Sequence, residues 1–211
     1  MLEMMFGTAN RRISRFMSWV LMRKYTAFTG KGKYFGTVFR SDFRRDNLGF
    51  IFQEYFLLDS LTIRENISVP LTLQKLPHKK IEKMVRSLAE RFGIASQLDK
   101  YPNELSGGQR QRASAARAIV KQPSILFADE PTGALDSNSA TELLKTLKEA
   151  NEELHTTILM VTHDAYAASF ANRILIFKDG SIIRELLKQD ADRRTFYETI
   201  AQEVAKLDTE R

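Results

Sequence analysis

The chain has 211 residues and a mass of 24.2 kDa, with 43% hydrophobic and 27% charged residues, which is the composition of an ordinary globular protein. It contains no cysteine, which excludes a disulfide framework or a thiolate metal site and fits a cytosolic protein. The net charge of +6 is local, because residues 1–46 hold ten Lys and Arg against three acidic residues, and the remainder holds 22 against 23. We therefore expect no nucleic-acid partner for the globular part.

The first 41 residues form a basic segment with neither clean periodicity nor a strand of convincing length. Their longest apolar stretch, Phe16–Met22, is far below the roughly 20 residues that span a bilayer. We predict that this segment is not natively folded and that residues 42–211 form the folded domain.

Short apolar runs alternate with helical periodicity after Asp46. In chain order, the predicted elements are a strand at Leu48–Phe52, a helix at Ile81–Phe92, a strand at Ser124–Ala128, a helix whose inner face carries Leu143, Leu144 and Leu147, a strand at Thr156–Val161, a hairpin of Arg173–Phe177 and Ser181–Arg184 around Asp179-Gly180, and a helix with Phe196, Ile200 and Val204. This order predicts an α/β fold with a mainly parallel sheet and flanking helices.

The run Leu105-Ser106-Gly107-Gly108-Gln109 precedes a stretch of small residues with helical character. Ser106 is a good helix N-cap, and the two glycines leave room for a phosphate at the positive end of the helix. A Ser-Gly-Gly loop alone is as often a plain turn, so the interpretation as an anion site depends on its context.

That context begins with Asp129-Glu130, which follows the strand Ser124–Ala128. Carboxylates at the carboxyl end of a central strand lie where α/β folds bind ligands. We expect Asp129 to hold Mg²⁺, directly or through water, and Glu130 to orient or deprotonate the attacking water. The alternative, two solvated acids after a strand, is the commoner meaning of an isolated pair.

Two further polar residues follow strands in the same way. His163 follows Thr156–Val161 and would lie beside the carboxylates if the two strands are neighbours, where it could stabilise a developing phosphate charge. Gln53 follows Leu48–Phe52 and could reach a metal or water. His78 and His155 lie in polar connections and are interpreted as ordinary surface residues.

These motifs together resemble the ATP-binding subunits of ABC transporters. Leu105–Gln109 is similar to the ABC signature motif, Ile125–Glu130 to Walker B, Gly133–Asp136 to the D-loop, His163 to the switch histidine and Gln53 to the Q-loop glutamine. The resemblance covers residues 42 to about 185. Phe43-Arg44-Arg45, Leu57-Leu58-Asp59 and Glu130–Gly133 resemble the branch that exports bacitracin and other antimicrobial peptides, which is related to the macrolide-export and lipoprotein-release ATPases.

The resemblance implies a P-loop NTPase-like fold with a helical subdomain at about residues 62–117. It implies an ATP- and Mg²⁺-dependent subunit at the inner face of the cell membrane, which acts with a permease and pairs head to tail with itself or with another ABC ATPase. The implied roles are catalysis for Glu130 and His163, metal binding for Asp129 and Gln53, and contact with nucleotide for Gln53, Ser106, Gly107, Gly108, Gln109 and Asp136. The loop after Gln53, with Tyr55 and Phe56, would face the permease, although core packing of the two rings is equally consistent with the sequence.

One family motif is missing from the 211 residues. No Gly, four residues, then Gly-Lys-Ser/Thr occurs, and Gly30–Lys33 lacks the hydroxyl residue that binds Mg²⁺. Family spacing would place this P-loop within the first ten residues and its strand before Met1, so we expect the domain to be incomplete at its N-terminus. Losing about four charge-assisted hydrogen bonds of roughly 1.5–3 kcal/mol each removes on the order of 6–12 kcal/mol of phosphate binding.

The missing P-loop leaves two functions open. The first is an exporter ATPase subunit with impaired ATP binding, and the second is a non-hydrolytic protein that binds a permease or lends its signature motif to an intact subunit. A nucleic-acid-associated ABC protein is disfavoured because the basic segment lacks interleaved aromatic residues. The abrupt onset of family-like sequence near Asp42 suggests a shifted reading frame or an erroneous start before it.

Overall fold

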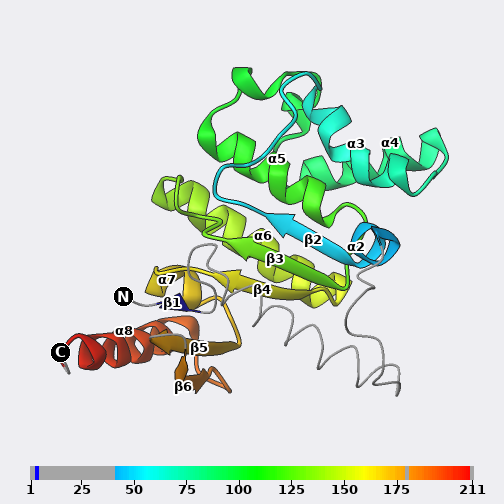
Figure 1. The fold of residues 1–211 in the computed structure, drawn as a ribbon. Coiled ribbons are helices and arrows are strands. Elements are labelled where there is room, and N and C mark those ends of the chain that lie inside the picture. The colour runs from blue at the N-terminus through cyan, green and yellow to red at the C-terminus, as the bar shows by residue number, and fades with distance from the viewer. Residues whose placement is uncertain (1–2, 5–40, 179–180, 210–211) are drawn as a thin grey trace, which may run out of the picture.

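The computed structural model describes residues 3–4, 41–178 and 181–209. Strands β2 (Leu48–Ile51), β3 (Ile125–Asp129) and β4 (Thr157–Val161) form a parallel sheet in that order (Figure 1). The register pairs Leu48 with Ile125 and Ile125 with Thr157. All three strands run in one direction, so their carboxyl ends lie at the same edge of the sheet.

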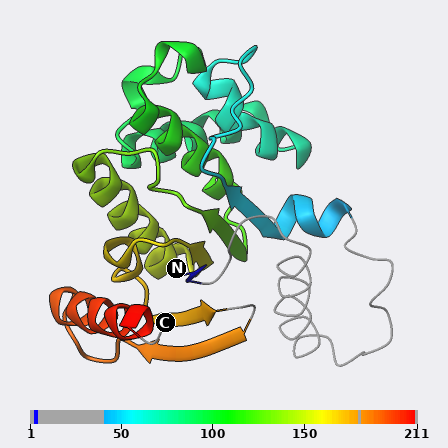
Figure 2. The same cartoon turned by 60° about the vertical axis from the view of Figure 1, so that its left-hand side comes forward.

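Helices cover this sheet and build a separate helical part beyond β2. The helices are α2 (Ser41–Asn47), α3 (Ile63–Leu73), α4 (His78–Arg91), α5 (Gly107–Ile119), α6 (Ser137–Leu154) and α7 (Ala165–Ala168), with 3₁₀ turns at Ala95–Gln97 and Pro102–Glu104. Figures 1 and 2 show α3, α4 and α5 grouped on the β2 side, whereas α6 lies along β3 and β4. The assignment of a helical subdomain at about residues 62–117 stays a prediction.

A continuous apolar core joins the helical part to the sheet. It includes Ile67 of α3, Val85 of α4 and Leu126 of β3, each completely buried. Helix α5 approaches β2 so closely that a Cβ on Gly49 would lie 2.6 Å from the carbonyl oxygen of Ala118. Only glycine fits at that position, so this contact fixes the distance between α5 and the sheet.

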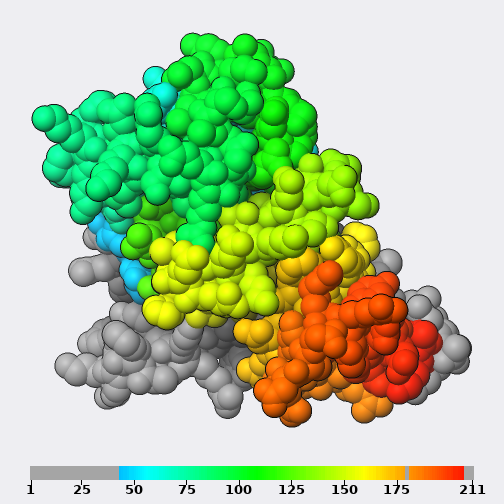
Figure 3. All heavy atoms as spheres, turned by 180° about the vertical axis from the view of Figure 1, so that it is seen from behind, coloured from blue at the N-terminus to red at the C-terminus, as the bar shows by residue number. Residues whose placement is uncertain are grey.

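The C-terminal part forms a second unit. Strands β5 (Arg173–Lys178) and β6 (Ser181–Leu187) are antiparallel, and the short strand β1 (Glu3–Met4) pairs with β5. Helix α8 (Arg193–Thr209) packs on this sheet through Phe196 and Ile200. In the space-filling view of Figure 3 it lies at the opposite end of the molecule from the helical part.

The predicted α/β architecture and mainly parallel sheet are confirmed, and the predicted strands and helices occur within a few residues of their expected bounds. Strand β4, expected to be central, has one strand neighbour in the sheet formed by the described residues. Helix α2 was not expected from the sequence. The Asp179-Gly180 turn and nearly all of residues 1–41 lie outside the described residues. Among the described helices, none is long and apolar enough to cross a membrane.

Candidate functional site

The carboxyl ends of β3 and β4 bring two predicted site residues together. Asp129 is paired with Val161 at the end of the two strands. The chain then turns at Glu130, which has a positive φ of 43° and donates its backbone N–H to the Val161 carbonyl at 2.9 Å. The turn places the Glu130 carboxylate against the residues that follow β4, as the adjacent-strand hypothesis requires.

The Glu130 carboxylate is held by three hydrogen bonds from that segment. Its Oε1 lies 2.7 Å from His163 Nδ1 and accepts the His163 backbone N–H at 2.9 Å, and its Oε2 accepts the Thr162 hydroxyl at 3.2 Å. Either His163 Nδ1 or Glu130 can be the donor in the first of these bonds, and Nδ1 is the donor whenever the carboxylate is ionised, because an ionised carboxylate only accepts hydrogen bonds. The His163 side chain is 71% exposed and the Glu130 side chain 20% exposed, so this pair faces solvent at the rim.

Asp129 differs from its neighbour, because its carboxylate accepts no hydrogen bond from the described residues. Burial, followed by the negative charge of Glu130, raises the pKa of Asp129 above the ordinary value. A cation placed here would relieve both effects. The described residues contain no group of three or more His, Cys, Asp or Glu that could hold a metal ion. The Asp129 carboxylate is a ligand of the type that Mg²⁺ takes, because Mg²⁺ is usually bound by one or two protein carboxylates with water and phosphate as the other ligands.

The side chain of Gln53 reaches the same rim from the loop after β2. Its Nε2 lies 3.3 Å from the position that a Cβ on Gly133 would occupy, and the Glu130 carbonyl oxygen lies 3.5 Å from that position. A larger residue at 133 would displace the Gln53 side chain. Gln53 and Glu130 therefore lie close to Gly133 and to each other, while their roles at one site stay predictions.

The glycine-rich run begins helix α5 in a capping box. The Ser106 hydroxyl accepts the Gln109 backbone N–H at 3.3 Å, and Gln109 Oε1 accepts the Ser106 backbone N–H at 3.0 Å. A Cβ on Gly108 would lie 3.0 Å from the Ser139 hydroxyl of α6. The predicted N-cap at Ser106 is confirmed, while the contact of Ser106, Gly107, Gly108 and Gln109 with a nucleotide stays a prediction.

Asp136 has a structural partner within its own chain. It is the N-cap of α6, where its Oδ1 accepts the backbone N–H groups of Asn138 and Ser139, each at 3.0 Å. The hydrogen bonds from Ser139 are the largest cause of a lowered pKa for Asp136. A role across an interface between two subunits stays a prediction.

Sequence reasoning missed a row of polar side chains on α5 that binds the loop after β2. Gln111 Nε2 donates to the carbonyls of Phe52 at 3.3 Å and Pro131 at 2.8 Å. Arg117 donates to the Phe56 carbonyl at 2.6 Å and the Tyr55 carbonyl at 3.0 Å. Burial lowers the pKa of Arg117.

A second contact holds the continuation of the same loop. Asn66 of α3 is completely buried; its Nδ2 donates to the carbonyls of Leu58, Leu61 and Thr62, and its Oδ1 accepts the Leu58 N–H at 2.8 Å. The one signal in the sequence was a polar residue between Ile63 and Ile67 on an otherwise apolar helix face.

Comparison with known proteins agrees with these motifs and their arrangement. The sequence matches the family described as ABC transporter over residues 19–133. The chain belongs to this family. It is 55% identical over 160 residues to the bacitracin export ATP-binding protein BceA of Halalkalibacterium halodurans, covering 76% of this chain and 63% of that protein. It is 46% identical over 165 residues to the ABC transporter ATP-binding protein YxdL of Bacillus subtilis, covering 78% of this chain and 64% of that protein.

The chain is also 46% identical over 149 residues to the macrolide export ATP-binding/permease protein MacB of Aggregatibacter actinomycetemcomitans, a match that covers 71% of this chain and 23% of that protein. The fold is similar to the dimeric post-hydrolysis structure of the ATP-binding cassette MJ0796 bound to ADP and Pi, with a TM-score of 0.63, 38% identity and coverage of 68% of this chain and 64% of that chain. The chain thus spans less than two thirds of the BceA and YxdL sequences that it matches.

Proposed function

We propose that this chain is an ATP-binding subunit of an ABC exporter, acting with a membrane permease at the inner face of the cell membrane. The observation that carries the proposal is the Glu130 carboxylate, fixed at the end of β3 by His163 and Thr162 from the end of β4. A carboxylate held in this way suits a general base next to a metal-bound phosphate, and Asp129 beside it accepts no hydrogen bond from the part of the chain that the structure describes. The antimicrobial-peptide branch is favoured by the similarity to the bacitracin export protein BceA.

Magnesium would be held at this rim, whereas the signature residues would act at the nucleotide of a second subunit. Asp129 and Gln53 would supply the protein oxygens for Mg²⁺, and the signature residues Ser106 and Gly108 would contact the phosphates of ATP held by a second subunit. When bound, Mg²⁺ would neutralise charge on the phosphates. The protein groups would then position the attacking water through Glu130 and His163.

A purified complex with its permease tests this function. At millimolar ATP, which offsets weak phosphate binding by this chain, we expect Mg²⁺-dependent release of phosphate from ATP, measured in membranes or nanodiscs, to fall about 100-fold in Glu130→Gln. Thr199→Ala on α8 is the matched control, because Thr199 is exposed and far along the chain from the rim. Hydrolysis that survives Glu130→Gln unchanged would contradict the assignment of Glu130.

A second function has one observation in its favour, namely that none of the 211 residues forms a Gly, four residues, then Gly-Lys-Ser/Thr motif. The chain would then not turn over ATP itself but would pair with an intact subunit and supply Ser106, Gly107 and Gly108 to that subunit's nucleotide. This alternative predicts an ATP-dependent complex with a P-loop-bearing ABC subunit, detectable by light scattering. It also predicts that the complex alone, and never the isolated chain, hydrolyses ATP.

A further inference from the structure

In the loop after β2, two successive aromatic residues adopt an unusual backbone conformation. Tyr55 and Phe56 have positive φ angles of 64° and 45°. The bulky side chains of such residues disfavour this region, so the surrounding contacts must enforce it. Within the loop, the Tyr55 N–H donates to the Phe52 carbonyl at 3.3 Å and the Phe56 N–H to the Glu54 carbonyl at 2.7 Å.

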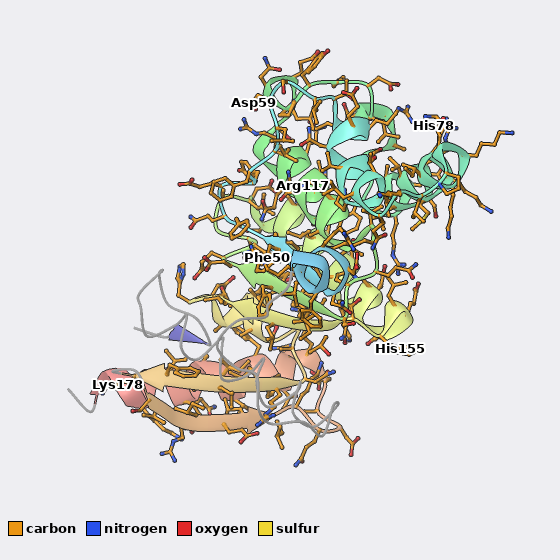
Figure 4. All side chains as sticks on the ribbon, turned by 45° about the vertical axis from the view of Figure 1, so that its right-hand side comes forward. Phe50, Asp59, His78, Arg117, His155 and Lys178 are labelled. Atoms are coloured by element: carbon orange, nitrogen blue, oxygen red, sulfur yellow. The ribbon has the colours of Figure 1, made fainter. Side chains whose placement is uncertain are left out.

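The enforcing contacts come from one face of helix α5. Three polar side chains spaced three residues apart, Gln111, Ser114 and Arg117, all donate to loop carbonyls. The Tyr55 carbonyl accepts from two of them, the Ser114 hydroxyl at 2.8 Å and an Arg117 N–H at 3.0 Å. Figure 4 labels Arg117 on α5, and the residue is half-buried.

The ring of Tyr55 contacts the opposite end of the same helix. Its hydroxyl lies 3.1 Å from the position of a Cβ on Gly107, and the Arg110 guanidinium carbon lies 5.2 Å from the ring centroid. Tyr55 thus spans α5 from Arg117, near the end of the helix, to its first residue. The first turn of α5 is also the capping box of the signature motif.

The other side of the loop is open to solvent. The side chain of Phe56 is 57% exposed and that of Leu58 is 48% exposed, and the Phe56 ring packs edge-on against Phe52 at 5.1 Å. A displacement of Phe56 would move the Phe56 carbonyl, which Arg117 binds, and the adjoining residue Tyr55. The loop therefore connects an exposed apolar surface to the start of α5.

We propose that Arg117 is a positioning residue, which anchors the Tyr55–Phe56 backbone on α5 so that the Tyr55 ring rests against Gly107 and links the exposed Phe56 surface to the signature motif. A guanidinium suits this task because its planar fork donates to two carbonyls at once, whereas a lysine donates from one point. The functional meaning of the link rests on the proposed function. The anchoring itself does not, since every contact lies within this chain.

Hydrogen–deuterium exchange of the free 211-residue chain tests the anchor. In Arg117→Lys we expect exchange in residues 54–58 to become about tenfold faster, because the loop opens locally more often, while exchange in β3 stays unchanged. Exchange at residues 105–110 should also rise. The matched control is Arg112→Lys, which changes an arginine of the same helix that binds Glu142 at 2.7 Å and not the loop.

A second variant, Tyr55→Phe, tests the link between the loop and the signature motif. Tyr55→Phe keeps the backbone anchors and removes the hydroxyl beside Gly107, so it should speed exchange at residues 105–110 and leave residues 54–58 protected. If Arg117→Lys does not fold, Ser114→Ala serves as the milder variant, with a smaller rise confined to residues 54–58.

Three results would overturn the proposal: unchanged exchange at residues 54–58 in Arg117→Lys, a uniform rise across the whole chain, or an equal effect of Arg112→Lys. Faster exchange at 54–58 without any change at 105–110 would remove the link to the signature motif. A failed hydrolysis test with the permease would remove the proposed function and leave the exchange result standing.

Discussion

Strands β3 and β4 are paired over their whole length and carry similar apolar sequences, yet their surroundings differ. In β3, Ile125, Leu126, Phe127 and Ala128 are all buried, because β2 and β4 flank the strand and helices cover it. In β4 the first four residues are only half-buried, and one described strand lies beside it in the sheet. The difference indicates that the packing of this domain is dominated by the side that faces α3, α4 and α5.

The largest expected loss of stability follows from this difference in burial between β3 and β4. Leu126→Ala empties a fully buried site in β3 and should lower the free energy of unfolding by about 3–5 kcal/mol. Leu159→Ala removes the same number of atoms at a half-buried position in β4 and should cost about 1–2 kcal/mol. Urea unfolding followed by circular dichroism measures both, and equal losses would contradict the contrast.

The hydrogen bonds of the buried Asn66 amide should contribute almost as much to the free energy of unfolding. Asn66→Ala leaves the carbonyls and N–H that its amide binds without partners, so we expect a loss of about 2–3 kcal/mol in the same unfolding assay. Thr72→Ala is the control, because its exposed hydroxyl bonds only to the Ser68 carbonyl in the preceding turn. A loss in Asn66→Ala no larger than in Thr72→Ala would show that the loop does not depend on Asn66.

The beginning of α5 is solvent-exposed, so its capping box should contribute less to the free energy of unfolding. Ser106→Ala breaks the capping box and should cost about 1 kcal/mol, whereas Ser106→Gly should cost only a few tenths because glycine also caps helices well. Thermal unfolding of the two variants gives the comparison. An alanine variant as stable as the glycine variant would mean that the cap contributes little here.

Replacing Asp129 should change the free energy of unfolding least, and should raise it rather than lower it. The pKa of Asp129 is raised in the folded chain, so ionisation opposes folding; the unfavourable contribution is absent below the unfolded pKa and appears as pH rises through the folded pKa. Asp129→Asn should therefore stabilise the chain at pH 7 by less than about 1 kcal/mol, since the Asp129 side chain is only partly buried and solvent screens its charge. The gain should vanish near about pH 3, where the unfolded carboxyl is also protonated. A gain at the acidic pH instead would contradict the sign.

The sequence predicted what depends on local patterns. The strands before Asp129 and His163 could be identified because each is a short apolar run, and their parallel pairing then placed Glu130 beside His163. Helix α2 could not be predicted, because Ser41–Asn47 lacks an apolar face; the Lys121 ammonium binds the carbonyls of Arg44 and Arg45 near its end.

The contacts of α5 with the loop were also beyond the sequence. Ser114 and Arg117 lie 59 to 62 residues after the carbonyls that they bind. Nothing local marks Tyr55, Phe56 or Glu130 for a positive φ, a conformation that glycine and asparagine adopt more readily. These positions are set by tertiary contacts, which override local preference.

We propose, as the central claim, that the rim at the ends of β3 and β4 carries the groups for water activation, and that this chain alone binds phosphate only weakly. Equilibrium binding of a fluorescent ATP analogue with Mg²⁺, competed by unlabelled ATP, tests it most directly. We expect no saturable binding at micromolar concentration in a folded, monodisperse sample. Saturable micromolar binding would contradict the account, because residues 1–41 would then have to supply a phosphate site that their sequence does not predict.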